Sequence, residues 1–74
     1  MKRSVKAITT YIDLEGGFWG LKADENYLAV NYPEQLKTNG IPVLCELEIL
    51  EDVVGFRNWG TPCRIIQFQT LKPY

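Results

Sequence analysis

The sequence predicts an all-β fold, a small barrel of five short strands with one helical turn. Five runs rich in β-branched, aromatic or alternating apolar residues are separated by glycine, proline, aspartate or asparagine, as in strands joined by turns. The one segment with helix-like signals is too short to form an independent helix. The chain of 74 residues is 46% hydrophobic, which suits one domain with a single core.

The first half of the chain predicts three strands, at residues 4–14, 18–23 and 27–32. Gly16 and Gly17 end the first strand, because glycine adopts a positive φ without steric cost. The polar residues 24–26 make a hairpin turn between the second and third strands. Pro33 ends the third strand, since proline cannot donate a hydrogen bond to a β-ladder. Alternation places three residues of this strand on one face: Leu28, Val30 and Tyr32.

The second half predicts two further strands, at residues 41–50 and 63–71. The first of them alternates clearly, so one set of its side chains faces the core: Ile41, Val43, Cys45, Leu47 and Ile49. Pro42 indicates either an edge position or the entrance to a strand. The connection between the two strands, residues 51–62, carries Phe56, Arg57 and Trp59. A long connection that bears aromatic residues is often functional.

A helical turn is expected at residues 33–40, with Leu36 as its core anchor and Gly40 as its cap. A short helical segment between the third and fourth of five strands is the order of an OB-fold, a five-stranded and partly open barrel. An SH3-like barrel is the alternative. The single domain is expected to span residues 1–74, with flexible ends at residues 1–3 and 72–74.

Two tryptophan–glycine steps, Trp19-Gly20 and Trp59-Gly60, lie far apart in the sequence. A glycine beside a tryptophan in a strand often marks a place where a ring or another backbone covers the missing side chain. We therefore expect the two segments to lie close together and to seal the barrel, with both indoles on the same side.

The chain resembles a family of short bacterial and archaeal proteins that are small OB-like domains, sometimes lipoproteins, without an assigned activity. The residues that carry the resemblance are 15–20 (EGGFWG), 32–34 (YPE), Gly40, 59–62 (WGTP) and 65–66 (II). The resemblance covers most of the chain and implies an OB-like fold, but it provides no catalytic residues. The loop before Trp59, residues 55–58 (GFRN), is less polar than the loop of the family, so a loop-borne function is not implied for this chain.

The charges and cysteines exclude several classes of function. A net charge of −1 argues against a general nucleic-acid-binding protein, which usually has a basic excess. Zinc and other metal sites are not expected, because the chain has no histidine and its two cysteines, Cys45 and Cys63, are far apart in sequence. Free thiols in a reducing cytoplasm are the first expectation for these cysteines, and a disulfide in an exported protein is the alternative. We see no signal peptide and no membrane-spanning apolar run, so the expected location is the cytoplasm.

Four acidic residues gather late in the chain: Glu46, Glu48, Glu51 and Asp52. They could form a cation site or a docking face for a basic partner, but a calcium ion needs six to eight oxygen ligands. The simpler interpretation is the solvent face of an edge strand, where charge discourages pairing between edges.

The function expected from these features is a non-enzymatic binding module without a cofactor, which engages a protein partner or a second copy of itself. The surface expected for this role combines the loop of residues 55–62 with the exposed face of the second and third strands. The alternative is a protein that binds single-stranded nucleic acid or oligosaccharide through exposed aromatic residues. The ligand-binding residues for that alternative are Trp19, Tyr27, Arg57 and Trp59. The competing interpretation is that both indoles are packed as part of a small core.

Overall fold

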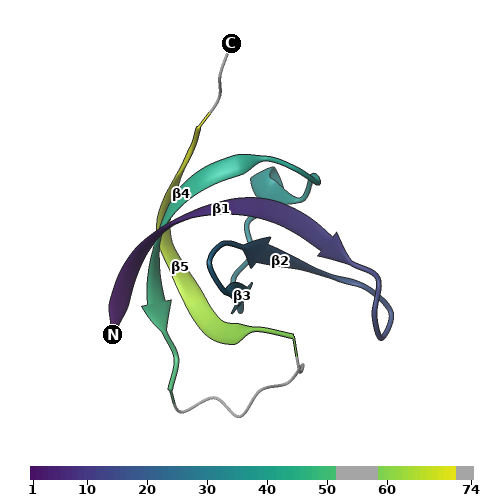
Figure 1. The fold of residues 1–74 in the computed structure, drawn as a ribbon, viewed down its shortest axis with the longest axis horizontal. Coiled ribbons are helices and arrows are strands. Elements are labelled where there is room, and N and C mark those ends of the chain that lie inside the picture. Colours follow the sequence, from purple (N-terminus) through teal and green to yellow (C-terminus); the bar gives the residue numbers. More distant parts are fainter. Residues whose placement is uncertain (52–58, 72–74) are drawn as a thin grey trace.

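The five strands of the protein close into a barrel (Figure 1). The structure is a computed structural model, and it describes residues 1–51 and 59–71. The elements in chain order are β1 (Lys2–Ile12), β2 (Phe18–Lys22), β3 (Asn26–Ala29), the 3-10 turn η1 (Glu34–Leu36), β4 (Pro42–Ile49) and β5 (Thr61–Thr70). Neighbours around the barrel follow the order β1, β2, β3, β5, β4, with β3 and β5 parallel and every other pair antiparallel. The predicted five-stranded barrel with one helical turn is confirmed.

The core lies inside the barrel and is built from alternate residues of β4. Val43, Cys45 and Leu47 are fully buried, as the strict alternation of this strand predicted. Ile41 and Ile49, the outer members of the predicted set, are partly buried and pack against the same cluster. Burial of these apolar side chains is the main stabilising contribution in a domain this small.

The turn η1 closes one end of the barrel through Leu36, which is fully buried and is the anchor that the sequence predicted. Gly40 has a φ of +86°, so it turns the chain from this segment toward β4. The turn is held to β1 by a buried hydroxyl. Thr9 donates a hydrogen bond to the carbonyl of Thr38 and accepts one from the backbone N–H of Ile41 at 2.8 Å.

Of the two alternatives for Pro42, the entrance to a strand is confirmed. Pro42 is the first residue of β4, where the strand does not need its N–H. The edge position does not apply, because β4 pairs with both β1 and β5. The predicted end of the third strand is wrong, because β3 ends at Ala29 rather than at residue 32, and Val30, which lies beyond its end, is 49% exposed.

The early end of β3 has a local cause in Asn31. Its side-chain Oδ1 accepts a hydrogen bond from the N–H of Ile65 at 2.8 Å, and its Nδ2 donates to the carbonyl of Ile65 at 2.9 Å. The carboxamide therefore takes the place of a further strand residue and ends the ladder between β3 and β5. No helix among the described residues is long and apolar enough to cross a membrane.

Candidate functional site

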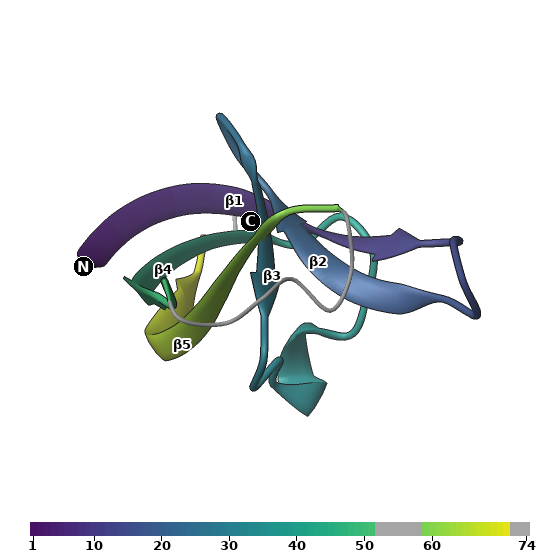
Figure 2. The same cartoon turned by 90° about the horizontal axis from the view of Figure 1, so that it is seen from below.

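A groove opens between β2 and β3, because these two strands diverge soon after their hairpin (Figure 2). The ladder between β2 and β3 has two residue pairs, Leu21 with Tyr27 and Lys22 with Asn26. The groove has a volume of about 380 Å³. Its lining is mostly apolar and aromatic: Gly17, Phe18, Trp19, Leu28, Ala29, Val30, Tyr32 and Lys37.

The hydrogen bonds around the hairpin show which backbone groups face this groove. In the turn, the N–H of Ala23 donates to the carbonyl of Glu25 at 3.0 Å. Backbone groups of alternate residues in a strand point to the same neighbour, so odd-numbered residues of β2 direct their N–H and C=O toward β3. The next pair in register would be Trp19 with Ala29, but the strands have already separated there. The backbones of Trp19 and Ala29 therefore face each other across the groove.

Trp19 is held in place by two tyrosines. The ring of Tyr11, its cross-strand partner on β1, meets the indole edge-on with centroids 5.2 Å apart, and the ring of Tyr32 lies 6.1 Å away. A side chain at Gly17 would clash with Tyr11, because a Cβ there would lie 1.7 Å from the tyrosine oxygen. The absence of a side chain at Gly17 therefore leaves room for Tyr11, whose ring packs on the indole.

Tyr32 connects this wall to β2 through its hydroxyl, which donates a hydrogen bond to the carbonyl of Gly20 at 3.1 Å. Burial raises the pKa of Tyr32, so the phenol stays protonated at neutral pH and keeps this bond. The bond connects the segment that follows β3 to β2, beyond the point where the two strands pair.

Trp59 lies on the other face of β2, against Gly20. A Cβ built at Gly20 would lie 2.3 Å from Cζ3 of Trp59, and the ring of Phe18 meets the indole edge-on at 6.0 Å. A Cβ at Gly60 would lie 2.8 Å from the carbonyl oxygen of Asn26, so this glycine also permits a close approach. The predicted meeting of the two tryptophan–glycine segments is confirmed.

The two indoles nevertheless do not share a surface. Adjacent residues of a strand point to opposite faces. Trp59 packs on the face of β2 where a side chain of Gly20 would lie, so the side chain of Trp19 lies on the opposite face. Their ring contacts are separate as well, with Tyr11 and Tyr32 for one indole and Phe18 for the other. The expectation that both indoles lie on the same side is wrong.

Two other residues that the sequence suggested for ligand binding do not extend the aromatic surface. Tyr27 is 1% exposed, so neither face of its ring is open to a ligand. Its hydroxyl accepts a hydrogen bond from Nη1 of Arg3 at 2.9 Å, and the same nitrogen forms an ion pair with Glu25 at 2.7 Å. Tyr27 is thus part of the contact between β1 and the β2–β3 turn. Arg57 lies outside the described residues.

The groove has little free positive charge. Lys37 is the only charged side chain among the described residues that line it, and its Nζ pairs with a carboxylate oxygen of Glu34 at 2.9 Å. Arg64 forms an ion pair with Glu48 across β4 and β5. The local charges are therefore compensated within the protein.

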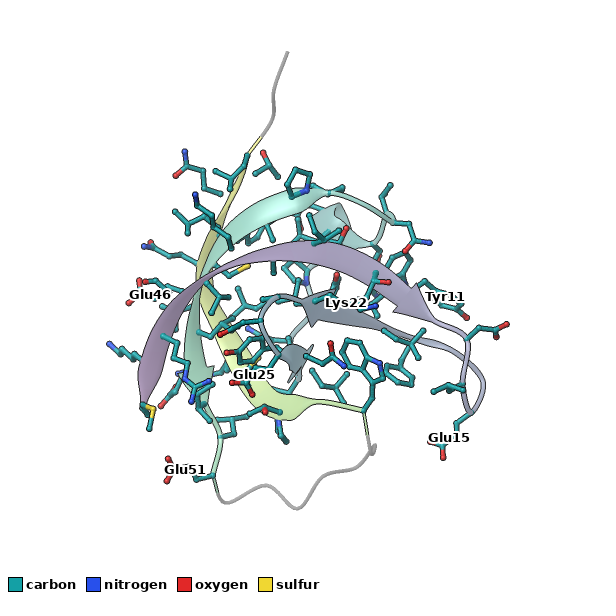
Figure 3. All side chains as sticks on the ribbon, viewed as in Figure 1. Tyr11, Glu15, Lys22, Glu25, Glu46 and Glu51 are labelled. Atoms are coloured by element: carbon teal, nitrogen blue, oxygen red, sulfur yellow. The ribbon has the colours of Figure 1, made fainter. Side chains whose placement is uncertain are left out.

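The acidic residues that gather late in the sequence do not form a site in the described part of the chain. Glu46 accepts a hydrogen bond from Gln67 at 3.1 Å and points away from the barrel, as does Glu51 (Figure 3). The hydrogen bond and charge of Arg64 lower the pKa of Glu48. No group of three or more metal-ligating side chains occurs in residues 1–51 and 59–71. Asp52 lies outside the described residues.

Cys45 and Cys63 are free and buried in the core. Burial raises the pKa of Cys45 to about 11 and that of Cys63 to about 12. Both side chains are therefore protonated thiols at neutral pH, and a thiol is a weak nucleophile compared with a thiolate. The expectation of reduced cysteines in the core agrees with this arrangement.

Comparisons of the chain with models of protein families, with curated proteins and with solved structures found no match. The geometry alone therefore defines the candidate site. Of the residues expected to bind a ligand, Trp19 lines the groove, while Phe18, Leu28, Tyr32 and Lys37 were not predicted for it. The signal in the sequence was the asparagine at position 31, whose side chain can replace a strand partner and so shorten β3.

Proposed function

We propose that the protein is a non-enzymatic binding module that holds an extended segment of a protein partner in the groove between β2 and β3. The observation that carries this proposal is the separation of the two strands after two pairs, with the backbones of Trp19 and Ala29 facing the groove. An extended peptide supplies backbone donors and acceptors at the spacing of a strand, and alternate side chains of that peptide would meet the walls.

The apolar lining supports a peptide with large apolar side chains. A groove of about 380 Å³ lies within the usual range of binding pockets, which is roughly 300–1,000 Å³. Leu28 and Val30 provide an aliphatic wall, and Trp19 with Tyr32 provides an aromatic one. Because the hydroxyl of Tyr32 already holds β2, the site is preformed and ligand binding has a small ordering cost.

The charges favour a peptide over single-stranded nucleic acid or an oligosaccharide stacked on several rings. Nucleic-acid affinity depends mainly on cations that contact phosphates, and Lys37 is already paired with Glu34. Two of the rings proposed for stacking are unsuitable, since Tyr27 is buried and Trp59 lies on the other face of β2. A role without catalysis is supported by the absence of histidine from the sequence and by the protonated state of both thiols.

The test is a selection from a display library of random twelve-residue peptides, followed by titration of the selected peptides into isotopically labelled protein. We expect chemical-shift changes at the amides of Trp19 and Ala29. Val30→Glu should weaken peptide binding by about tenfold or more, because it puts a charge into the apolar wall. Leu14→Glu is the matched control, because Leu14 is similarly exposed and does not line the groove.

A parallel titration uses ten-residue oligothymidine and cellohexaose at low and high salt. The proposal is wrong if these probes shift the groove amides while no selected peptide does so. It is also wrong if peptides bind equally well to the Val30→Glu and Leu14→Glu variants, because the binding surface would then lie elsewhere.

A further inference from the structure

A second surface, independent of the groove, lies along the edge of β5. This strand pairs with β4 along most of its length, from Cys63 to Thr70, but it pairs with β3 over Thr61–Cys63 alone. The carboxamide of Asn31 then occupies the N–H and C=O of Ile65 and ends that ladder. Beyond Ile65, β5 continues with no strand beside it on this edge among the described residues.

The hydrogen bonds to β4 show which groups the edge presents. The N–H of Leu71 donates to the carbonyl of Pro42 at 2.8 Å, so Leu71 faces β4. By alternation, Gln69 also faces β4, whereas the N–H and C=O of Phe68 and Thr70 face away from it. In the described part of the chain, no backbone hydrogen bond to Phe68 or Thr70 is found on that outer side.

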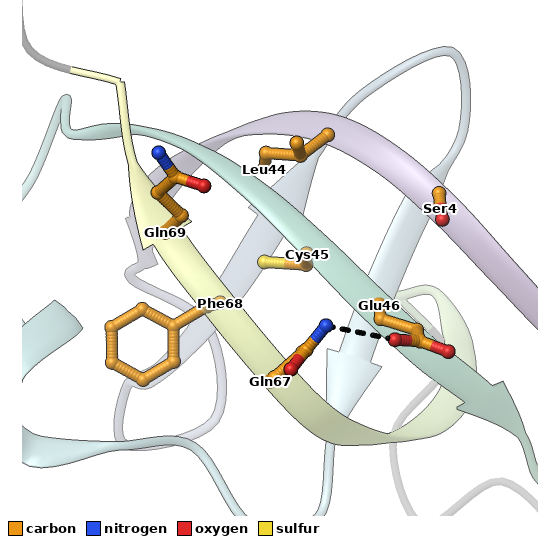
Figure 4. Close-up of a pocket in the computed structure, with 7 residues that line it drawn as sticks. All are labelled: Ser4, Leu44, Cys45, Glu46, Gln67, Phe68 and Gln69. Atoms are coloured by element: carbon orange, nitrogen blue, oxygen red, sulfur yellow. Dashed lines mark hydrogen bonds between the residues drawn. The ribbon is translucent and has the colours of Figure 1, made fainter.

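The side chains along this edge do not prevent pairing with another strand. The segment 65–71 (IIQFQTL) contains no charged residue, no proline and no glycine. Gln67, Gln69 and Thr70 are exposed and Ile66 is 39% exposed, so no described residue covers these side chains, whereas Phe68 is partly buried against the core. Figure 4 shows Phe68 projecting from β5 on the side away from β4, next to a hollow of about 220 Å³. Uncharged segments of this kind with high β-propensity are prone to pair with other strands.

The open edge of β1 differs from that of β5. The N–H of Ile49 donates to the carbonyl of Met1 at 2.7 Å, so odd-numbered residues of β1 face β4 in this half of the strand. The backbones of three residues therefore face away from β4: Lys2, Ser4 and Lys6. Two lysines on a free edge discourage strand addition, because each new partner strand would have to accommodate their charges. Of the edges of β1 and β5, only that of β5 is thus uncharged.

We propose that a second copy of this chain binds along this edge, with the two β5 strands antiparallel. A twofold axis at Gln69 places Phe68 of one copy opposite Thr70 of the second copy, and the reverse. The two pairs would form about four backbone hydrogen bonds. The antiparallel arrangement also keeps charges apart, because Arg64 of the two copies would lie at opposite ends of the shared ladder.

The outer face of the sheet supports the same partner. Leu44 is the cross-strand neighbour of Gln69 and is 38% exposed. In the paired arrangement, the Gln69 side chains of the two copies meet at the axis, flanked on each side by Leu44. Paired amides and flanking apolar groups make the surface complementary to itself.

The test combines sedimentation velocity over a range of concentrations with amide hydrogen exchange measured at low and high concentration. The short ladder buries little area, so we expect a weak and reversible dimer, with a dissociation constant between roughly 10 μM and 1 mM. The exchange of the Phe68 and Thr70 amides should slow as the concentration rises. The Gln69 amide, which faces β4, should be protected at every concentration.

Thr70→Pro removes an N–H from the free edge and leaves the ladder to β4 intact, so the association constant should fall by about tenfold or more. Thr70→Val is the matched control because it keeps the N–H. Gln69→Lys, which places two like charges opposite each other, provides a second variant that does not change the backbone. A strict monomer at 1 mM would overturn the proposal, as would a dimer whose concentration-dependent protection lies at Lys2, Ser4 and Lys6. Equal dimerisation of the Thr70→Pro and Thr70→Val variants, or of Gln69→Lys and the unmodified protein, would also overturn it.

Discussion

The contact between Gly20 and Trp59 makes the sharpest prediction about the stability of this barrel. Gly20→Ala would place a methyl group 2.3 Å from Cζ3 and 2.6 Å from Cη2 of the indole, and 3.0 Å from Cδ1 of Ile12. Carbon atoms in good contact are about 3.5–4.0 Å apart, so the indole would have to move by more than about 1 Å. The Phe18 ring restricts this movement, because it meets the indole edge-on.

An overpacked site of this kind costs about 1–3 kcal/mol, and we expect a loss of about 2 kcal/mol for Gly20→Ala. For a domain of this size, that corresponds to a fall in melting temperature of roughly 8–16 °C. Urea denaturation followed by far-ultraviolet circular dichroism measures the free energy of unfolding. The circular dichroism signal does not depend on Trp59, so the same measurement also serves for variants that lack this residue.

A double-mutant cycle assigns the cost to the indole. In a Trp59→Ala background the space over Gly20 is open, so Gly20→Ala should be neutral or stabilise the protein by about 0.5 kcal/mol, since glycine weakens a strand interior. The expected coupling between the two positions is therefore about 2 kcal/mol. If Gly20→Ala costs the same in both backgrounds, within about 0.5 kcal/mol, the packing of Trp59 on Gly20 is refuted.

Three further predictions concern other parts of the barrel. The hydrogen bond from Arg3 lowers the pKa of Glu25 below its ordinary value of 4.5, so Glu25 stabilises the fold fully above that pH and less as the pH falls through its folded-state pKa. The melting temperatures of the unmodified protein and Glu25→Gln should therefore differ most at neutral pH and converge in acid, whereas parallel curves would contradict the ion pair. Asn31→Leu removes both hydrogen bonds to β5, so the free energy of unfolding measured by urea denaturation should fall by about 1–3 kcal/mol. A loss under about 0.5 kcal/mol would show that the carboxamide does not hold the strand. Burial raises the pKa of Cys45 and Cys63, so iodoacetamide at pH 8 should modify these thiols quickly in the urea-unfolded protein and only slowly in the folded protein. Rapid labelling of the folded protein would show that the thiols are accessible.

Several features of the fold could be predicted because they depend on short stretches of sequence. Strict alternation identified the buried face of β4, and Val43, Cys45 and Leu47 are buried as expected. The single apolar residue in the helical turn, Leu36, is the core anchor. The close approach at Gly20 was predicted from one residue beside a tryptophan, since a missing side chain leaves room for a ring.

The candidate site was harder to predict because it depends on where two strands stop pairing. The alternation in residues 27–32 predicts a longer β3, but the side chain of Asn31 replaces the strand at Ile65. Tyr27 was expected at the surface, yet the closed barrel places it in the core with only its hydroxyl reaching Arg3. Both outcomes follow from long-range contacts that the local pattern of apolar residues does not encode.

The amino-acid sequence by itself determined the strand content, the order of the elements, the core face of β4 and the closeness of the two tryptophan–glycine steps. Each of these follows from side-chain alternation, turn-forming residues or a missing Cβ, which act over a few residues. Only the tertiary structure decided that the indoles lie on opposite faces of β2, that β2 and β3 separate to form a groove, and that β5 has an uncharged free edge. The reason is that a backbone hydrogen bond depends on the register between strands, and closure of the barrel sets that register.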